Sequence, residues 1–173
     1  MANEYERRFL LSGLPEGEAS YEREIRQVYW RLGNGWSLRL RRQGSDFEPD
    51  DVVTIKGPRV GAQRPEFEWP LYNVTDSMQV RAASLEAALN LYRAGSAHPV
   101  VKTRRGYLID GQLWDVDEFH HDNEGLIIAE LELESHEDLL GVRRPPWTVR
   151  EVTMEERYNN ENLAFEPYRS WAS

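Results

Sequence analysis

The feature of this sequence that most constrains its fold is an alternation of polar and apolar residues with a period of two. Successive side chains of a β-strand point to opposite faces, so this pattern predicts strands with one polar and one apolar face. The pattern recurs in residues 4–9, 25–32, 36–41, 53–56, 64–71, 102–104, 114–117 and 129–134. These make about eight strands, which is enough to close a small barrel.

Turn residues separate these segments and indicate how the strands connect. They are Gly33-Asn34-Gly35, Gly57-Pro58, Gly106, Asp110-Gly111 and Asn123-Glu124-Gly125. The Asp110-Gly111 step predicts a tight hairpin between the strands that contain Arg104 and Trp114. No internal repeat or long linker divides the chain, so we expect residues 1–173 to form a single, mostly antiparallel β domain.

Helices are expected at a few places between or after the strands. Residues 76–95 predict one, because Asp76 and Gln79 resemble a capping box and apolar residues follow at helical spacing as far as Gly95. Shorter helices are expected from Ser135 and within residues 155–165. The predicted fold class is therefore mainly β with peripheral helices (α+β).

Composition and charge exclude several classes of protein. The chain has 30 acidic and 21 basic residues, and a net charge of −9 argues against sequence-independent binding of DNA or RNA. No apolar run approaches the ~20 residues that a membrane helix needs, and no cysteine is present to form a disulfide or a thiolate metal site. The N-terminus lacks the apolar core of a signal peptide, so we expect a cytoplasmic protein. The sequence is compatible with a homodimer.

The polar side of the predicted strands carries charges in same-sign pairs, two residues apart. Such residues lie roughly 6.5 Å apart on one side of a strand, so like charges repel unless an opposite charge lies between them. The acidic members are Glu4, Glu6, Glu66, Glu68, Asp115, Asp117, Glu130, Glu132 and Glu134. The basic members are Arg8, Arg39, Arg41, Lys56, Arg64, Lys102 and Arg104.

Two interpretations of this charged face remain open from the pattern alone. It is either the outer face of a sheet laced with cross-strand ion pairs, or the interior of a closed barrel. In the second case, clustered carboxylates would bind a hard divalent cation such as Mg²⁺ or Mn²⁺. The basic groups would then bind an oxygen-rich anion, most naturally a polyphosphate, through charge-assisted hydrogen bonds.

The N-terminal pattern Glu4-x-Glu6-x-Arg8 resembles the ExExK signature of the CYTH family, also called the triphosphate tunnel metalloenzymes. The resemblance continues along the chain through SLRLRRQG, VTIKGP, RPEFEWP, VVKTRRGY, WDVDEF and AELELES to EVTMEERYNNENLA. The closing segment is most similar to short, stand-alone bacterial members. The resemblance implies an eight-stranded antiparallel β-barrel that forms a tunnel for triphosphate and divalent metal.

The same resemblance assigns roles to the charged residues. The implied metal ligands are Glu4, Glu6, Glu130 and Glu132, with Asp117 or its neighbour Asp115 as a further acidic position and Glu66 or Glu68 as an addition. The implied phosphate-binding residues are Arg8, Arg39, Arg41, Lys56, Arg64, Lys102 and Arg104. These are the residues that the alternation places on the charged face.

One residue departs from the family signature, because Arg8 stands where the signature has lysine. Arginine keeps the positive charge and can bind phosphate with two donors, but it does not lose its proton at ordinary pH. In some members that lysine pairs with a tyrosine on the next strand, and Tyr29 is the candidate for that role in this sequence. An Arg8–Tyr29 catalytic pair would therefore stabilise charge without acting through a neutral amine.

The expected function is divalent-metal-dependent hydrolysis of a small linear triphosphate, with inorganic tripolyphosphate as the favoured substrate and Mg²⁺ or Mn²⁺ as cofactor. Within the family, the alternatives are adenylate cyclase, thiamine triphosphatase and nucleoside triphosphatase. Outside enzyme classes, the alternatives are a non-catalytic polyphosphate- or nucleotide-binding module and a purely structural barrel. Neither GxxxxGK[ST] nor GxGxxG occurs, so a P-loop or a Rossmann site is not expected.

Overall fold

The computed structural model describes residues 5–44, 49–58, 65–70, 90, 93–95, 98–133, 141–142 and 144–172. Its strands form an antiparallel sheet in the order β5-β4-β3-β2-β6-β7-β8-β1-β9. They are β1 (Tyr5–Leu10), β2 (Tyr21–Gly33), β3 (Trp36–Gly44), β4 (Pro49–Lys56), β5 (Glu66–Pro70), β6 (Val100–Ile109), β7 (Gln112–Phe119), β8 (Ile127–Leu133) and β9 (Arg150–Glu151). The predicted mainly β, antiparallel fold is confirmed.

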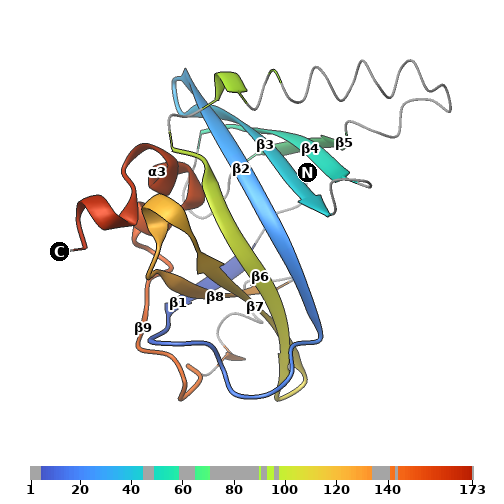
Figure 1. Ribbon diagram of the computed structural model, residues 1–173, viewed down its shortest axis with the longest axis vertical. Coiled ribbons are helices and arrows are strands. Elements are labelled where there is room, and N and C mark those ends of the chain that lie inside the picture. Colours follow the sequence, from blue (N-terminus) through green and yellow to red (C-terminus); the bar gives the residue numbers. More distant parts are fainter. Residues whose placement is uncertain are drawn as a thin grey trace, which may run out of the picture.

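The sheet differs from the expected barrel in strand number and in closure. A ninth strand is present because the short β9 pairs with Phe9 and Leu10 of β1. Within the described part of the chain, β5 pairs with β4 alone and nothing joins it to β1 or β9, so the sheet is open. β5 ends at Pro70, which has no N–H to extend a ladder. Figure 1 shows the sheet bent about the long strands β2 and β6.

Two tight hairpins connect neighbouring strands where turn residues occur in the sequence. Asn34 and Gly35 join β2 to β3 with φ angles of 49° and 77°, and Asp110 and Gly111 join β6 to β7 with 51° and 77°. Positive φ at both central residues is typical of a type I′ turn, whose twist matches that of the flanking strands. The hairpin predicted at residues 110–111 is confirmed.

Strand register separates the two faces of the sheet. On the inner face, Arg104 lies opposite Asp117, and Glu130 lies opposite both Asp115 and Arg8. The outer face of β1, β6, β7 and β8 is apolar and buries a cluster of Phe9, Tyr107, Trp114, Val116, Ala129 and Leu131 under Val142 and Trp147. Burial of this outer side holds the strands in the register that gathers the charges on the inner side.

One end of the inner face is apolar and is covered by the C-terminal segment. Val100, Phe119 and Ile128 share this face with Lys102 and the other charges, but they pack in a core cluster with Leu163. Leu163 belongs to α3 (Asn160–Phe165), which follows the short helix η2 (Glu156–Tyr158) and precedes η3 (Tyr168–Ser170). The helix expected within residues 155–165 is therefore confirmed, and it lies next to the charged part of the inner face.

The other predicted helices fall largely outside the described residues. Of residues 76–95, Asn90, Arg93 and Ala94 are described and are helical, and the Trp30 indole N–H donates to the Ala94 carbonyl at 3.0 Å. The helix expected from Ser135 begins outside the described residues. In the part of the chain that is described, no helix has the length and apolar character needed to cross a membrane.

Candidate functional site on the inner face of the sheet

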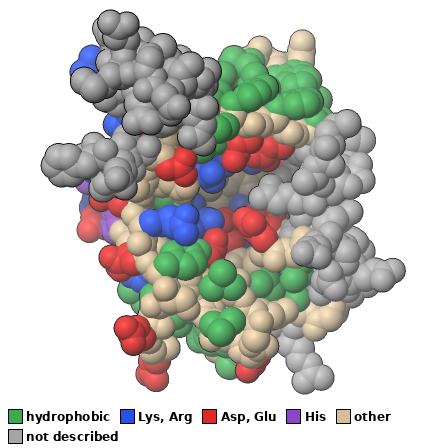
Figure 2. Space-filling model, turned by 90° about the vertical axis from the view of Figure 1, so that its right-hand side faces the viewer, with side chains coloured by type: hydrophobic (Ala, Val, Ile, Leu, Met, Phe, Trp, Pro, Cys, Tyr) green, Lys and Arg blue, Asp and Glu red, His purple; other side chains and the backbone are tan. Residues whose placement is uncertain are grey.

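The inner face gathers most of the described charged residues that the alternation selected. Figure 2 shows basic and acidic side chains grouped around a hollow in this side of the molecule. They form two clusters, one on β6, β7 and β8 and the other on β3, β4 and β5. We call them the Arg104 cluster (Lys102, Arg104, Asp115, Asp117, Glu130) and the Arg39 cluster (Arg39, Arg41, Lys56, Glu66, Glu68).

Arg104 binds three carboxylates at once. Its Nε and Nη2 donate to Asp117 at 2.7 Å each, Nη1 donates to Asp115 at 2.8 Å, and Nη2 also donates to Glu130 at 2.5 Å. The guanidinium is largely buried, which opposes its charge, but Asp117, Glu130 and Asp115 outweigh that cost and raise its pKa. Arg104 is thus a fixed positive charge that holds the acidic strands β7 and β8 in place.

Lys102 and Asp117 form a buried ion pair beside Arg104. Their side chains are 1% and 0% exposed, and the ammonium contacts the carboxylate directly. Burial opposes ionisation of Asp117, but Lys102 and Arg104 outweigh it and hold the pKa of Asp117 below its ordinary value. The Lys102 ammonium also lies 3.5 Å from the Asn160 side-chain oxygen, at the start of α3.

The Arg39 cluster carries more cations than acids. Arg39 donates to Glu68 at 3.1 Å and lies 3.6 Å from Glu66, which is 2.8 Å from the Lys56 ammonium. Burial, followed by repulsion from Arg39, lowers the pKa of Arg41. The Nε atoms of Arg39 and Arg41 are buried and have no hydrogen-bond partner among the described residues. Buried donors without partners carry a desolvation cost that an anion would relieve.

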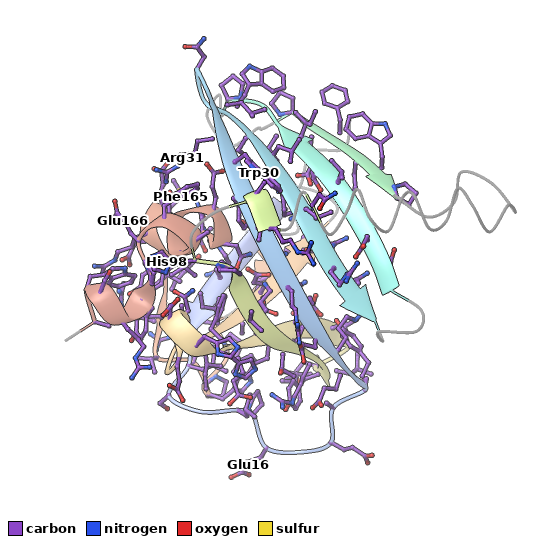
Figure 3. The ribbon with its side chains drawn as sticks, turned by 45° about the horizontal axis from the view of Figure 1, so that its top comes forward. Glu16, Trp30, Arg31, His98, Phe165 and Glu166 are labelled. Carbon is purple, nitrogen blue, oxygen red and sulfur yellow. The ribbon has the colours of Figure 1, made fainter. Side chains whose placement is uncertain are left out.

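The C-terminal helix adds polar groups that sequence reasoning missed. Glu161 accepts a hydrogen bond from the Ser37 hydroxyl at 2.9 Å and lies 3.7 Å from Arg31. Arg31 also lies over the Phe165 ring at 4.1 Å, which docks α3 on β2, as Figure 3 shows. The only sequence signal for these contacts is the polar run NNEN at residues 159–162, whose position against the sheet depends on tertiary packing.

Three further polar residues on the inner face were not selected from the sequence. Thr54 accepts from Arg39 at 2.9 Å, and Gln27 accepts from the Tyr29 hydroxyl at 2.8 Å. Tyr21, the first residue of β2, donates to Asp115. All three stand at the alternate strand positions that face the inner side, so the period-two pattern could have identified them. They were not selected because the selection used charged residues, and these three are uncharged.

Arg8 and Tyr29 have different partners in the structure. Arg8 donates to the Thr153 carbonyl at 2.9 Å and lies 3.5 Å from Glu6. Tyr29 is buried in the apolar cluster that packs against α3, and burial raises the pKa of its hydroxyl. The hydroxyl therefore stays protonated and donates to Gln27. A catalytic role for Arg8 and Tyr29 stays a prediction.

The structure describes only some of the remaining predicted metal and phosphate ligands. Glu6 and Glu132 lie directly opposite each other on β1 and β8. Glu4 and Arg64 lie outside the described residues. Among the residues that are described, no three His, Asp or Glu side chains converge as metal ligands would. The donor set nevertheless consists of carboxylate oxygens, which are the donors that Mg²⁺ and Mn²⁺ prefer.

A cavity of about 510 Å³ opens elsewhere, on the outer side of β2 and β6. His120, His121 and Arg26 are among its lining residues, and no member of the Arg104 or Arg39 cluster lines it. It is therefore separate from the candidate site.

Known proteins match this chain over nearly its whole length. The model of the CYTH domain family matches residues 2–163. An inorganic triphosphatase from Acetivibrio thermocellus is 31% identical over 172 residues, covering 99% of both chains. An inorganic triphosphatase from Nitrosomonas europaea is 33% identical over 163 residues, covering 93% of this chain and 96% of that protein.

Solved structures support the same fold. A crystal structure of the inorganic triphosphatase NE1496 matches with a TM-score of 0.63 and 31% identity, covering 95% of each chain. The PH1819 protein from Pyrococcus horikoshii OT3 matches with a TM-score of 0.50 and 20% identity, over 79% of this chain and 82% of that one. At that identity, the second match bears on the fold alone.

Proposed function

This chain belongs to the CYTH domain family, and from that premise we propose that it hydrolyses inorganic tripolyphosphate with the help of a divalent cation. The observation that carries the proposal is the Arg39 cluster, with its two buried guanidinium nitrogens that lack a hydrogen-bond partner in the part of the chain that the structure describes. Such a group fits a multivalent anion with many oxygens. The two relatives named as inorganic triphosphatases, which match nearly all of the chain, support the choice of substrate.

We propose that the substrate lies between the two clusters on the inner face. Arg39, Arg41 and Lys56 would bind phosphoryl oxygens from the β3–β4 side, and Arg104 and Lys102 from the β6 side. Positive charges fixed in this way stabilise the charge that shifts to the leaving phosphate in the transition state. Because the guanidinium groups are already held by carboxylates, little reorganisation is needed when that charge develops.

The divalent cation, Mg²⁺ or Mn²⁺, would be held by Glu6, Glu130 and Glu132, with Asp117 and Glu4 as the further acidic positions. When bound, such a cation polarises phosphoryl oxygens and lowers the pKa of a water that attacks phosphorus. Glu130 has a second task in this proposal, because it also positions Arg104.

Arg8 and Tyr29 support the reaction without exchanging protons in our proposal. Arg8 adds positive charge at the β1 end of the face, and its side chain is a guanidinium in place of the amine of the family signature. The raised pKa of Tyr29 keeps its hydroxyl protonated, so it can donate a hydrogen bond but does not act as a base. Neutral-amine chemistry at the position of Arg8 is therefore not part of the mechanism.

The test is phosphate release from tripolyphosphate, ATP and thiamine triphosphate, each with Mg²⁺, Mn²⁺ or EDTA. We expect release from tripolyphosphate that requires the metal and that Glu130→Gln abolishes. Glu118→Gln is the matched control, because Glu118 lies on the outer face of the neighbouring strand and pairs with Arg105. Absence of metal-dependent release, or full activity of the Glu130 variant, contradicts the proposal. Formation of cyclic AMP from ATP would instead identify a cyclase.

A further inference from the structure

Tyr21 reaches across a neighbouring strand to the charged site. Its direct cross-strand partner on β6 is Gly106, and Gly106 in turn lies opposite Asp115 of β7. The Tyr21 ring lies over Gly106 so closely that a Cβ added to Gly106 would be 2.2 Å from the ring. At the far end of the ring, the hydroxyl donates a hydrogen bond to Oδ1 of Asp115.

We propose that Tyr21 is a positioning residue for the triphosphatase site, acting through Asp115 on Arg104, with Gly106 providing the space that the ring needs. This inference rests on the proposed function, since it assigns Arg104 to the substrate-binding face. Tyr21 touches neither substrate nor metal in this scheme. Its hydroxyl fixes one oxygen of Asp115 while Arg104 binds the other at 2.8 Å.

Asp115 is the carboxylate of the Arg104 cluster that needs such support. Its side chain is 21% exposed, whereas that of Asp117 is 0% exposed and is held by both Lys102 and Arg104. Without the Tyr21 hydroxyl, Arg104 would be the one remaining described hydrogen-bond partner of Asp115. Rotation of Asp115 towards water would then release Nη1 of Arg104 and loosen its orientation.

The ring is itself held from two sides, so the hydroxyl is presented in a defined direction. Arg23 lies over the ring at 4.5 Å, and Gly106 lies beneath it. The Ser20 N–H also donates to the Gly106 carbonyl at 2.8 Å, which fixes the start of β2 against β6. An aromatic ring packed over a strand glycine is a recognised way to cover the backbone that the glycine exposes.

Tyr21→Phe tests the proposal, because it removes the hydroxyl and keeps the ring over Gly106. We expect kcat for tripolyphosphate to fall about tenfold to a hundredfold, as is usual when a supporting hydrogen bond to a site residue is lost. We expect KM to change little, because Arg104 keeps its charge and loses only its orientation. Tyr158→Phe is the control, since that hydroxyl also has one described partner, Arg150, away from the site.

A double-mutant cycle with Asp115→Asn separates positioning from general stability. If Tyr21 acts through Asp115, the loss in the double variant is smaller than the product of the two single losses. Independent losses, wild-type kinetics in Tyr21→Phe, or an equal loss in Tyr158→Phe would each overturn the proposal. Gly106→Ala should reproduce the kcat loss of Tyr21→Phe, because the added methyl displaces the ring.

A readout in the free protein keeps this inference separate from the proposed function. The side-chain Nε–H of Arg104 can be followed by NMR without any substrate. We expect Tyr21→Phe to shift this signal and speed its exchange with water, and Tyr158→Phe to leave it unchanged. An unchanged signal refutes the positioning role. A wild-type protein that hydrolyses no triphosphate refutes the proposed function even where the signal shifts.

Discussion

At the scale of single residues, the inner face contains one ion pair that water does not reach, between Lys102 and Asp117. Asp117 is fully buried and accepts from both Lys102 and Arg104, so it stays ionised in the folded protein below its ordinary pKa of 3.8. A buried pair of this kind adds little to stability as a whole, but removal of one partner leaves an uncompensated charge. The arrangement therefore constrains the two cations more than it stabilises the fold.

The lowered pKa of Asp117 predicts that the stability of the protein depends on pH. As the pH falls past 3.8, Asp117 takes up a proton in the unfolded chain while the folded protein keeps it ionised. The unfolded state then binds more protons, so the free energy of unfolding decreases as the pH falls. Urea unfolding between pH 5 and 3 should show a slope smaller in Asp117→Asn than in wild type, by at most ~1.4 kcal/mol per pH unit.

Glu118→Gln is the control for this experiment, because its carboxylate lies on the outer face and is 35% exposed. In Glu118→Gln, the free energy of unfolding should change with pH more nearly as it does in wild type. Identical slopes in wild type and Asp117→Asn would mean that the pKa of Asp117 is the same in the folded and unfolded states, contrary to the contacts it makes.

The sequence correctly predicted which face of the sheet a residue lies on, because the alternation of side chains along a strand decides this alone. Lys102, Arg104, Asp117 and Glu130 were selected because alternate residues of a strand share a face, and the structure gathers them. The contact of Lys102 with Asn160 was not predictable in this way, because the two residues are 58 positions apart and meet through the docking of α3.

At the scale of elements, the two type I′ hairpins can be compared, because each has a glycine with the same backbone conformation but different surroundings. Gly35 and Gly111 both have φ of 77°, a conformation that costs a residue with a side chain roughly 1–2 kcal/mol. A Cβ on Gly111 would meet open space, whereas one on Gly35 would lie 2.9 Å from Cβ of Pro58. The hairpin between β2 and β3 therefore carries a steric constraint that the hairpin between β6 and β7 lacks.

We predict that Gly35→Ala destabilises the protein more than Gly111→Ala. The backbone cost is shared, and overpacking against Pro58 adds about 1–3 kcal/mol. Chemical unfolding of the two variants measures the difference directly. Equal losses of stability would show that Pro58 moves aside at no cost.

An element could be predicted where a few neighbouring residues determine it. It could not be predicted where it depends on contacts between segments far apart in the sequence. The Asp110-Gly111 hairpin follows from two residues that tolerate positive φ. Closure of the sheet depends on whether edge strands far apart in the sequence meet, and the alternation of polar and apolar residues contains no information about this. The strand β5 was expected within residues 64–71, but its place at an open edge of the sheet and the additional strand β9 were not anticipated.

At the scale of the whole molecule, a chain of net charge −9 is proposed to bind a polyanion. Long-range attraction does not favour this, so binding depends on cations concentrated on the inner face and screened from the acidic surface. The Arg39 cluster meets this requirement, because three of its five members are basic and their charges lie on adjoining strands. Ligand binding should therefore depend on these cations and not on basic residues in general.

The last prediction compares two pairs of arginines by thermal unfolding. Tripolyphosphate with Mg²⁺, at a concentration 100 times its Kd, should stabilise the protein by ~2.7 kcal/mol, or roughly 5–10 °C in Tm for a chain of this size. Arg39→Gln with Arg41→Gln should abolish the shift. Arg26→Gln with Arg105→Gln removes equal charge from the outer face and should preserve it. Equal effects of the two pairs would mean that overall charge, and not the inner face, controls binding.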